Sequence, residues 1–246
     1  MVFTARIVGA TALIAERKKP GTKLPDVKGW ALRSKLFVVL EFFTVLAVIG
    51  LWMLSDSFFE FESLLDLSVA ALPIQVTVNF AVSTFVFYWW HRVRHENDWL
   101  WRVTHQFHHS PSRIEMITAF YKHPTEVALD TLLNLALSFL LLGVSVEAFV
   151  AHSACIACSQ FFVHMNVATP RRVGWFIQRP EMHRIHHEFG VHKDNYADLP
   201  LWDMVFGTYR NPECVNLECG FETSRESRVL DMLAGKDIHK SNTQKP

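Results

Sequence analysis

Long apolar runs alternate with charged segments along the chain, and four of these runs are long enough to cross a membrane. A helix that crosses a bilayer needs about 20 predominantly apolar residues. The pattern predicts spans at about residues 36–54, 67–90, 126–142 and 146–165, with Pro73 interrupting the second. The third and fourth are separated only by Gly-Val-Ser and form a hairpin, either as two full spans or as a pair that barely crosses. We therefore predict an all-α integral membrane protein with about four transmembrane helices.

Basic residues are confined to the segments between these runs. No Lys or Arg occurs in residues 36–90 or 123–170, and all 24 lie elsewhere. Because membrane proteins concentrate Lys and Arg in cytoplasmic segments, we place residues 1–35 and the segments after the second and fourth spans in the cytoplasm. The membrane is then a bacterial inner membrane or the endoplasmic reticulum. A formal net charge of zero gives no indication of a nucleic-acid partner.

The chain divides into three regions. They are a basic cytoplasmic N-terminal segment (1–35), a membrane-embedded domain (36–210) whose cytoplasmic helical cap comprises 91–125 and 166–210, and a polar C-terminal tail (211–246). The nine-residue apolar run Ile7–Ala15 is too short to span a bilayer. We predict that it lies on the membrane surface, and the alternative is the core of a signal peptide.

Histidines crowd the predicted cap in three clusters. The first holds His91 and His95, the second His105, His108 and His109, and the third His183, His186 and His187. Residues three and four apart project from one face of a helix. The imidazoles of each cluster should therefore converge on a small volume, as ligands of a metal ion do.

Eight imidazoles are more than the four ligands of a tetrahedral structural zinc, and they suit two metal ions. Neutral imidazole suits Zn, Cu, Fe and Ni. The metalloprotease motif HExxH is absent, because no His stands three positions after Glu96. His164, at the cytoplasmic end of the fourth span, is favoured as a ninth ligand, since an unpaired polar group at membrane depth is expensive and usually functional.

Other polar residues near the clusters have weaker claims. Glu188 follows the third cluster and is a candidate partner that holds an imidazole tautomer. His123 precedes a proline at a membrane boundary. It could support a metal ligand or have a purely structural role, and both alternatives remain open. His152 is interpreted as a buried structural residue. His192 and His239 are interpreted as surface residues, although His192 is close enough to the third cluster to remain a candidate.

The order and spacing of the three clusters resemble those of the membrane fatty acid hydroxylase and sterol desaturase superfamily. Further motifs agree, namely Trp90-His91-Arg92, His109-Ser110, Tyr121-Lys122-His123-Pro124, Asp194-Asn195-Tyr196 and residues 202–209. The resemblance covers roughly residues 80–210. Ala197 departs from it, because family members usually have Gly after Asn-Tyr. A positive φ at this position would strain Ala, and we expect the turn to adapt.

The resemblance implies a non-haem di-iron oxygenase that uses O2 and electrons from an external donor, with no protein nucleophile. The ligands would be the eight clustered histidines and His164, and zinc can replace the iron on purification. Asp194, Asn195 and Asp203 would supply supporting hydrogen bonds or serve as ordinary turn residues. The substrate would be a membrane lipid with a fatty acyl, sterol or isoprenoid chain, and hydroxylation is the favoured reaction.

Other activities remain open at the same site. They are lipid desaturation and the oxidative cleavage of an ether lipid. The alternatives that are not enzymes are a metal transporter and a metal-binding scaffold, and the transporter is disfavoured because the clusters lie outside the apolar spans. We expect a separate ferredoxin or cytochrome with its reductase, since no electron-carrier domain fits into 246 residues beside four spans. The spacing specifies neither the lipid nor the oligomeric state.

Overall fold

A computed structural model of the chain describes residue 16 and residues 20–239, and every regular element in this part is helical. Extended pairing within it is limited to two isolated bridges, Pro20 with Val167 and Glu188 with Cys219. The predicted all-α fold is therefore confirmed. The surface segment predicted for Ile7–Ala15 lies outside the described residues.

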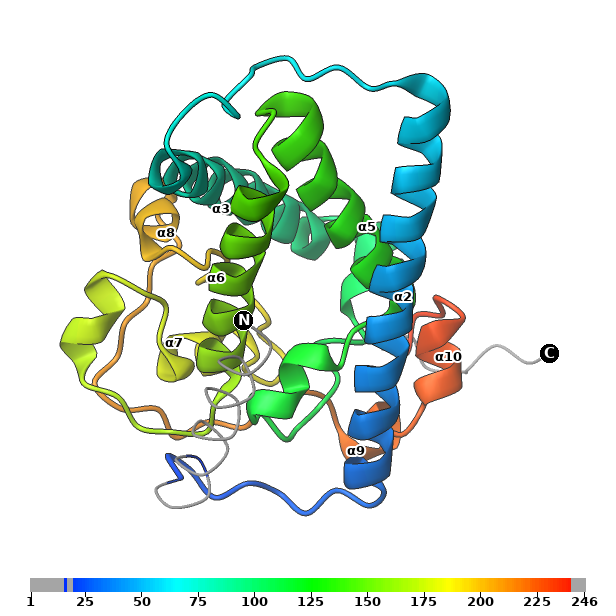
Figure 1. Cartoon of the computed structure of the whole chain (residues 1–246). Coiled ribbons are helices and arrows are strands. Elements are labelled where there is room, and N and C mark those ends of the chain that lie inside the picture. The colour runs from blue at the N-terminus through cyan, green and yellow to red at the C-terminus, as the bar shows by residue number, and fades with distance from the viewer. Residues whose placement is uncertain (1–15, 17–19, 240–246) are drawn as a thin grey trace.

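Four helices are long and apolar enough to cross a membrane, as predicted. They are α2 (Trp30–Phe59), α3 (Leu72–Glu96), α5 (Pro124–Leu135) with its continuation as the π-helix η3 (Ala136–Leu141), and α6 (Val146–His164). Helix α2 packs against α5 and α3 packs against α6 (Figure 1). The tight turn between η3 and α6 produces the predicted hairpin.

Helices α2 and α3 begin and end at different residues from those that the sequence pattern predicts. α2 is 30 residues long, or about 45 Å at 1.5 Å per residue, so it extends beyond a hydrocarbon core of about 30 Å. α3 begins at Leu72 because Pro73 fits the first turn of a helix. It also continues past Trp90 to Glu96, which places His91 and His95 on the last turns of a membrane helix.

The cap is built from short helices between and after the long ones. These are α4 (Asp98–Leu100), the π-helix η1 (Trp101–His105), the 3-10 helices η2 (Met116–Phe120) and η4 (Arg171–Trp175), α7 (Pro180–His186), α8 (Pro200–Phe206), α9 (Thr223–Glu226) and α10 (Val229–Leu233). Their connections bring together the three histidine clusters, which are far apart in the sequence.

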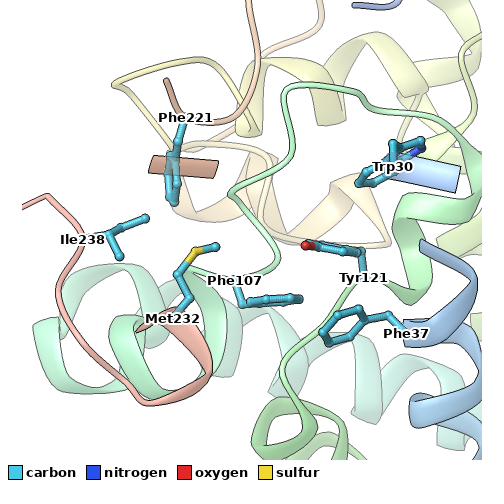
Figure 2. Close-up of a cluster of buried hydrophobic side chains, with 7 residues drawn as sticks. All are labelled: Trp30, Phe37, Phe107, Tyr121, Phe221, Met232 and Ile238. Carbon is cyan, nitrogen blue, oxygen red and sulfur yellow. The ribbon is translucent and has the colours of Figure 1, made fainter. Parts of the chain in front are cut away.

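A buried aromatic cluster joins α2 to the cap and to the C-terminal segment. Figure 2 shows its members, which are Trp30, Phe37, Phe107, Tyr121, Phe221, Met232 and Ile238. Phe107 stacks on Tyr121 with ring centroids 4.5 Å apart, and Phe37 packs against both rings. Residues 211–246 are thus not simply a polar tail, because three apolar side chains from this segment complete the cluster; residues 240–246 lie outside the described part.

The segment between α2 and α3 is attached to the end of η3 by backbone hydrogen bonds. Leu64 N–H donates to the Leu140 carbonyl at 2.7 Å and Leu65 N–H to the Leu141 carbonyl at 3.0 Å. Gly143 has a φ of +59°, and a Cβ there would lie 2.2 Å from the backbone oxygen of Leu65. Only glycine fits this close approach without strain.

Gly143→Ala should therefore lower the free energy of unfolding by at least about 1–3 kcal/mol, the usual cost of a strained backbone residue. Thermal unfolding of the detergent-solubilised protein measures the change. Gly50→Ala is the matched control, because a Cβ at Gly50 in α2 meets nothing within 4 Å and alanine favours a helix. An unchanged unfolding midpoint for Gly143→Ala would contradict this account of the turn.

Candidate metal centre

The nine histidines predicted as ligands lie in two groups. His91, His95, His105, His109 and His186 form group 1, and His108, His164, His183 and His187 form group 2. Within each group one ring nitrogen from every member lies within 4.8 Å of all the others. Among the described residues, the histidines of these two groups are the predicted nine and no others. The structure thus brings together the side chains that two metal ions would need.

Each of the last two sequence clusters is divided between the groups. His105 and His109 belong to group 1, whereas His108 belongs to group 2. In the third cluster His186 belongs to group 1, and His183 and His187 to group 2. The π-helical turn η1 ends at His105, the first histidine of the second cluster, and the short α7 carries most of the third cluster. Neither group can therefore be formed by one segment of the chain.

Backbone carbonyls orient four of these imidazoles. The Nδ1–H of His91 donates to the carbonyl of Tyr196, and that of His186 donates to the carbonyl of Asp194, both at 2.7 Å. The Nδ1–H of His164 donates to the carbonyl of Gln160 at 2.7 Å, and that of His108 donates to the carbonyl of Tyr121 at 3.3 Å. A carbonyl oxygen can only accept, so in each ring the proton is on Nδ1 and Nε2 keeps its lone pair. This is how proteins commonly fix the tautomer of a metal-binding histidine.

The resulting lone pairs point at one another. Nε2 of His108 lies 3.2 Å from Nε2 of His164, and Nε2 of His91 lies 2.9 Å from Nε2 of His105. Two lone pairs that face each other repel unless a cation lies between them. The buried Nε2 of His186 has no hydrogen-bond partner among the residues that the structure describes. Both groups therefore fit metal ions, and group 1 offers five nitrogens, one more than a tetrahedral structural zinc takes.

Burial keeps the cap imidazoles neutral. It lowers the pKa of His186 to about 3, and it holds the pKa values of His183 and His187 well below the usual 6.5. Neighbouring imidazoles lower the latter two further. A metal ion binds neutral imidazole, so these residues need not lose a proton at pH 7 before they bind.

Glu126 is a supporting residue that the sequence analysis missed. It is buried, and its Oε1 accepts from Nδ1–H of His105 and from Nη1 of Arg94, both at 2.8 Å. A carboxylate behind a metal-binding imidazole orients the ring and makes it more basic. The signal in the sequence was an acidic residue in the first turn of an apolar span, where an ionised group is expensive.

Asp194, Asn195 and Asp203 all organise the loop that faces group 1. Asp203 accepts from the backbone N–H groups of Tyr196 and Ala197 at 2.8 and 2.9 Å, next to the carbonyl that holds His91. Asn195 donates from its side chain to the carbonyl of residue 182. The carbonyl of Asp194 holds His186. Asp194 and Asn195 have positive φ and Ala197 does not, so the departure from glycine causes no strain.

Three further residues near the clusters, His123, Glu188 and His192, lie outside both groups. His123 caps α5, accepting from Thr125 N–H at 3.0 Å, and lies outside both groups. Within the described part, no hydrogen bond joins the side chain of Glu188 to an imidazole. His192, predicted to be a surface residue, has its Nδ1 3.2 Å from Nδ1 of His109, and its Nε2 is buried. The His192 ring is therefore a direct neighbour of group 1.

A cavity of about 430 Å³ adjoins both groups. His91, His105, His108 and His183 lie in its wall. Apolar side chains from the membrane helices line it as well, including Val45, Ile49, Phe149, Ile156 and Phe161. The lining suits an occupant with an apolar chain.

Comparisons with known proteins agree with this site. The sequence model of the family described as "Fatty acid hydroxylase" matches residues 76–208. The chain is 32% identical over 150 residues to an ornithine lipid hydroxylase of Rhizobium tropici, which covers 57% of this chain and 43% of the relative. It is 29% identical over 131 residues to an alkylglycerol monooxygenase of Xenopus tropicalis (51% and 28%). It is 28% identical over 126 residues to sphinganine C4-monooxygenase 1 of Arabidopsis thaliana (50% and 48%).

The matched region therefore spans less than half the length of each of these three relatives. No solved structure gives a significant match to the chain. The family match nevertheless contains all nine histidines of the two groups.

Removing one imidazole from either group should release about half of the bound metal, because the other group keeps all its ligands. His186→Ala tests group 1 and His183→Ala tests group 2, with elemental analysis of the purified protein as the measurement. His239→Ala is the control, since His239 is exposed and belongs to neither group. Full metal content in His183→Ala would refute the assignment of His183 as a ligand.

Glu126→Gln should lower the metal affinity of group 1 by about 10–100-fold, because the ring of His105 loses its carboxylate partner. A chelator titration measures the affinity. Asp130→Asn is the matched control, one helical turn further along α5, where the carboxylate accepts from Trp90 Nε1 at 2.7 Å and, within the described part of the chain, makes no hydrogen bond to an imidazole. Equal losses of metal affinity in both variants would show that the loss comes from removing a negative charge and not from the contact between Glu126 and His105.

Proposed function

Because the chain belongs to the fatty acid hydroxylase family, we propose that it is an O2-dependent, non-haem di-iron oxidoreductase that hydroxylates a C–H bond of a membrane lipid. The observation that carries the proposal is the pair of histidine groups, each with converging Nε2 atoms, beside a cavity with apolar walls. A transporter or a structural metal site would not need a cavity of this kind next to both groups.

Group 1 and group 2 would each hold one iron ion. When bound, the two ions supply the reductive activation of O2, a chemistry that protein side chains alone do not provide. One oxygen atom enters the C–H bond and the other leaves as water, which consumes two electrons and two protons. An external ferredoxin or cytochrome with its reductase would supply the electrons.

The protein's own residues bind and position the reactants. The carbonyls of Tyr196, Asp194 and Gln160 hold the imidazoles in one tautomer, and burial keeps water away from them. The apolar wall of the cavity would bind the lipid chain and bring one C–H bond to the side where His105 and His108 lie. Holding the reacting atoms in this way lowers the entropic part of the barrier.

The protein is a multi-pass membrane protein by its four apolar helices, and we propose that the site faces the cytoplasm. The support for this orientation is the restriction of Lys and Arg to the segments on the side of the cap. Hydroxylation is favoured over desaturation because the relatives cited above are named hydroxylases or monooxygenases.

The purified protein, supplied with ferredoxin, its reductase and heavy-isotope O2, should add one labelled oxygen atom to a component of a total membrane lipid extract. Mass spectrometry of the extract detects the product. His105→Ala and His183→Ala should form none, and His239→Ala should match the unchanged protein. A product that has lost two hydrogens without gaining oxygen would replace hydroxylation with desaturation.

A further inference from the structure

The charged side chains of the cavity wall gather at the end next to the histidine groups. They are Glu41, Arg94, Lys122, Glu126, Asp130 and Asp198. On α2, Glu41 lies one turn from Phe37, which packs against the cap, whereas Val45 and Ile49 continue the same face away from it. The cavity is therefore charged near the site and apolar along α2 beyond it.

Four of these charged groups have partners within the protein. Arg94 Nη1 pairs with Glu126 Oε1 at 2.8 Å and lies 3.5 Å from Asp130. Asp130 also accepts from Trp90 Nε1. Asp198 Oδ1 accepts from the side-chain amide of residue 160 at 2.6 Å and from the hydroxyl of residue 159 at 3.2 Å. These groups hold the helices together and need no ligand.

Lys122 and Glu41 have no such partners. Among the described residues, no hydrogen bond and no ion pair within 4.0 Å involves the ammonium group of Lys122 or the carboxyl group of Glu41. The two groups also do not pair with each other, although each lies within electrostatic reach of the other. Ionisable groups without a partner are expensive in a membrane domain and are usually kept for function.

Lys122 keeps its charge at neutral pH. Burial alone would lower its pKa, but the carboxyl groups of Glu41, Glu126 and Asp130 outweigh this effect and raise the pKa above its usual value. An ammonium ion in a cavity binds carboxylate or phosphate oxygens. A carboxylate such as that of Glu41 accepts hydrogen bonds from an ammonium group.

We propose that Lys122 and Glu41 recognise a lipid with a zwitterionic head, in which Lys122 binds a carboxylate or phosphate and Glu41 binds an ammonium group. This rests on the proposed function, because the same cavity holds the substrate. The head then lies beside His105 and His108, and the apolar chain extends past Val45 and Ile49. The oxidised carbon is accordingly in the head or in the part of the chain next to it.

Other lipids leave part of this charge unpaired. A sterol, an isoprenoid or a neutral glyceride would pair with neither group, and a free fatty acid would satisfy only Lys122. A zwitterionic lipid is the class that pairs with both groups at once. The proposal therefore restricts the range of substrates that the histidine spacing leaves open.

Binding to the full-length, iron-loaded protein in detergent, without an electron donor, tests the proposal independently of oxygenation. Five probes share a twelve-carbon chain: N-α-lauroyl-lysine, lauroyl lysophosphatidylethanolamine, lauric acid, dodecylamine and monolauroylglycerol. Calorimetry should show at least one zwitterion binding about tenfold or more tightly than monolauroylglycerol, as expected for charge-assisted hydrogen bonds. The ratio of the affinities for the first two probes distinguishes a preference for a carboxylate head from a preference for a phosphate head.

Substitutions separate the two charges. Lys122→Met should lower the affinity for the zwitterion to that for dodecylamine, and Lys122→Arg should preserve it. Glu41→Gln should lower the affinity for the zwitterion to the affinity for lauric acid. Monolauroylglycerol should bind equally to all variants. Metal content and thermal unfolding are measured on the same samples, and the Arg and Gln variants keep the test valid if Lys122→Met does not fold.

The proposal is overturned if monolauroylglycerol binds the unchanged protein as tightly as both zwitterions do, or if the substitutions weaken all five probes equally. The second result would show that Lys122 and Glu41 have a structural role only. A protein that discriminates between the heads but adds no oxygen to any lipid would refute the proposed hydroxylase activity and leave the head-group recognition intact.

Discussion

The structure depends on one electrostatic constraint, which is that buried, neutral imidazoles direct their lone pairs at common points. His108 and His164 illustrate it, since each ring donates its Nδ1 proton to a carbonyl and the two Nε2 atoms are 3.2 Å apart. Such lone pairs repel unless a cation lies between them. The folded arrangement would therefore be linked to metal binding, because bound ions would remove a repulsion that the fold creates.

The rest of the molecule supplies the parts that this constraint requires. The loop around Asp194 and Tyr196 provides two of the carbonyls, and Asp203 holds that loop through backbone N–H groups. Glu126 provides the partner for His105 from a membrane helix. The aromatic cluster around Tyr121 fixes α2 and the C-terminal segment to the cap (Figure 2). The membrane helices thus position the site as well as anchor it.

The cavity would connect this centre to the proposed lipid substrate. Its wall combines four histidines of the two groups with apolar side chains and with two ionisable groups, Lys122 and Glu41, that have no partner in the described part of the chain. A wall of this composition favours a substrate whose head lies at the site and whose chain lies between the helices. Substrate selection would then rest on residues outside the histidine motifs, so related proteins with the same motifs can act on different lipids.

The amino-acid pattern alone was enough to predict the all-α membrane fold, the four apolar spans and the nine histidines that the structure brings together, because length, apolarity and helical spacing are local properties. Tertiary structure decided how those histidines are grouped, since His105 and His108 are only three residues apart and yet belong to different groups. It also decided that Glu126 contacts the ring of His105, that His123 is a helix cap and that Phe221 packs into the cap. Each of these depends on which residues from distant segments meet, and no local pattern carries that information.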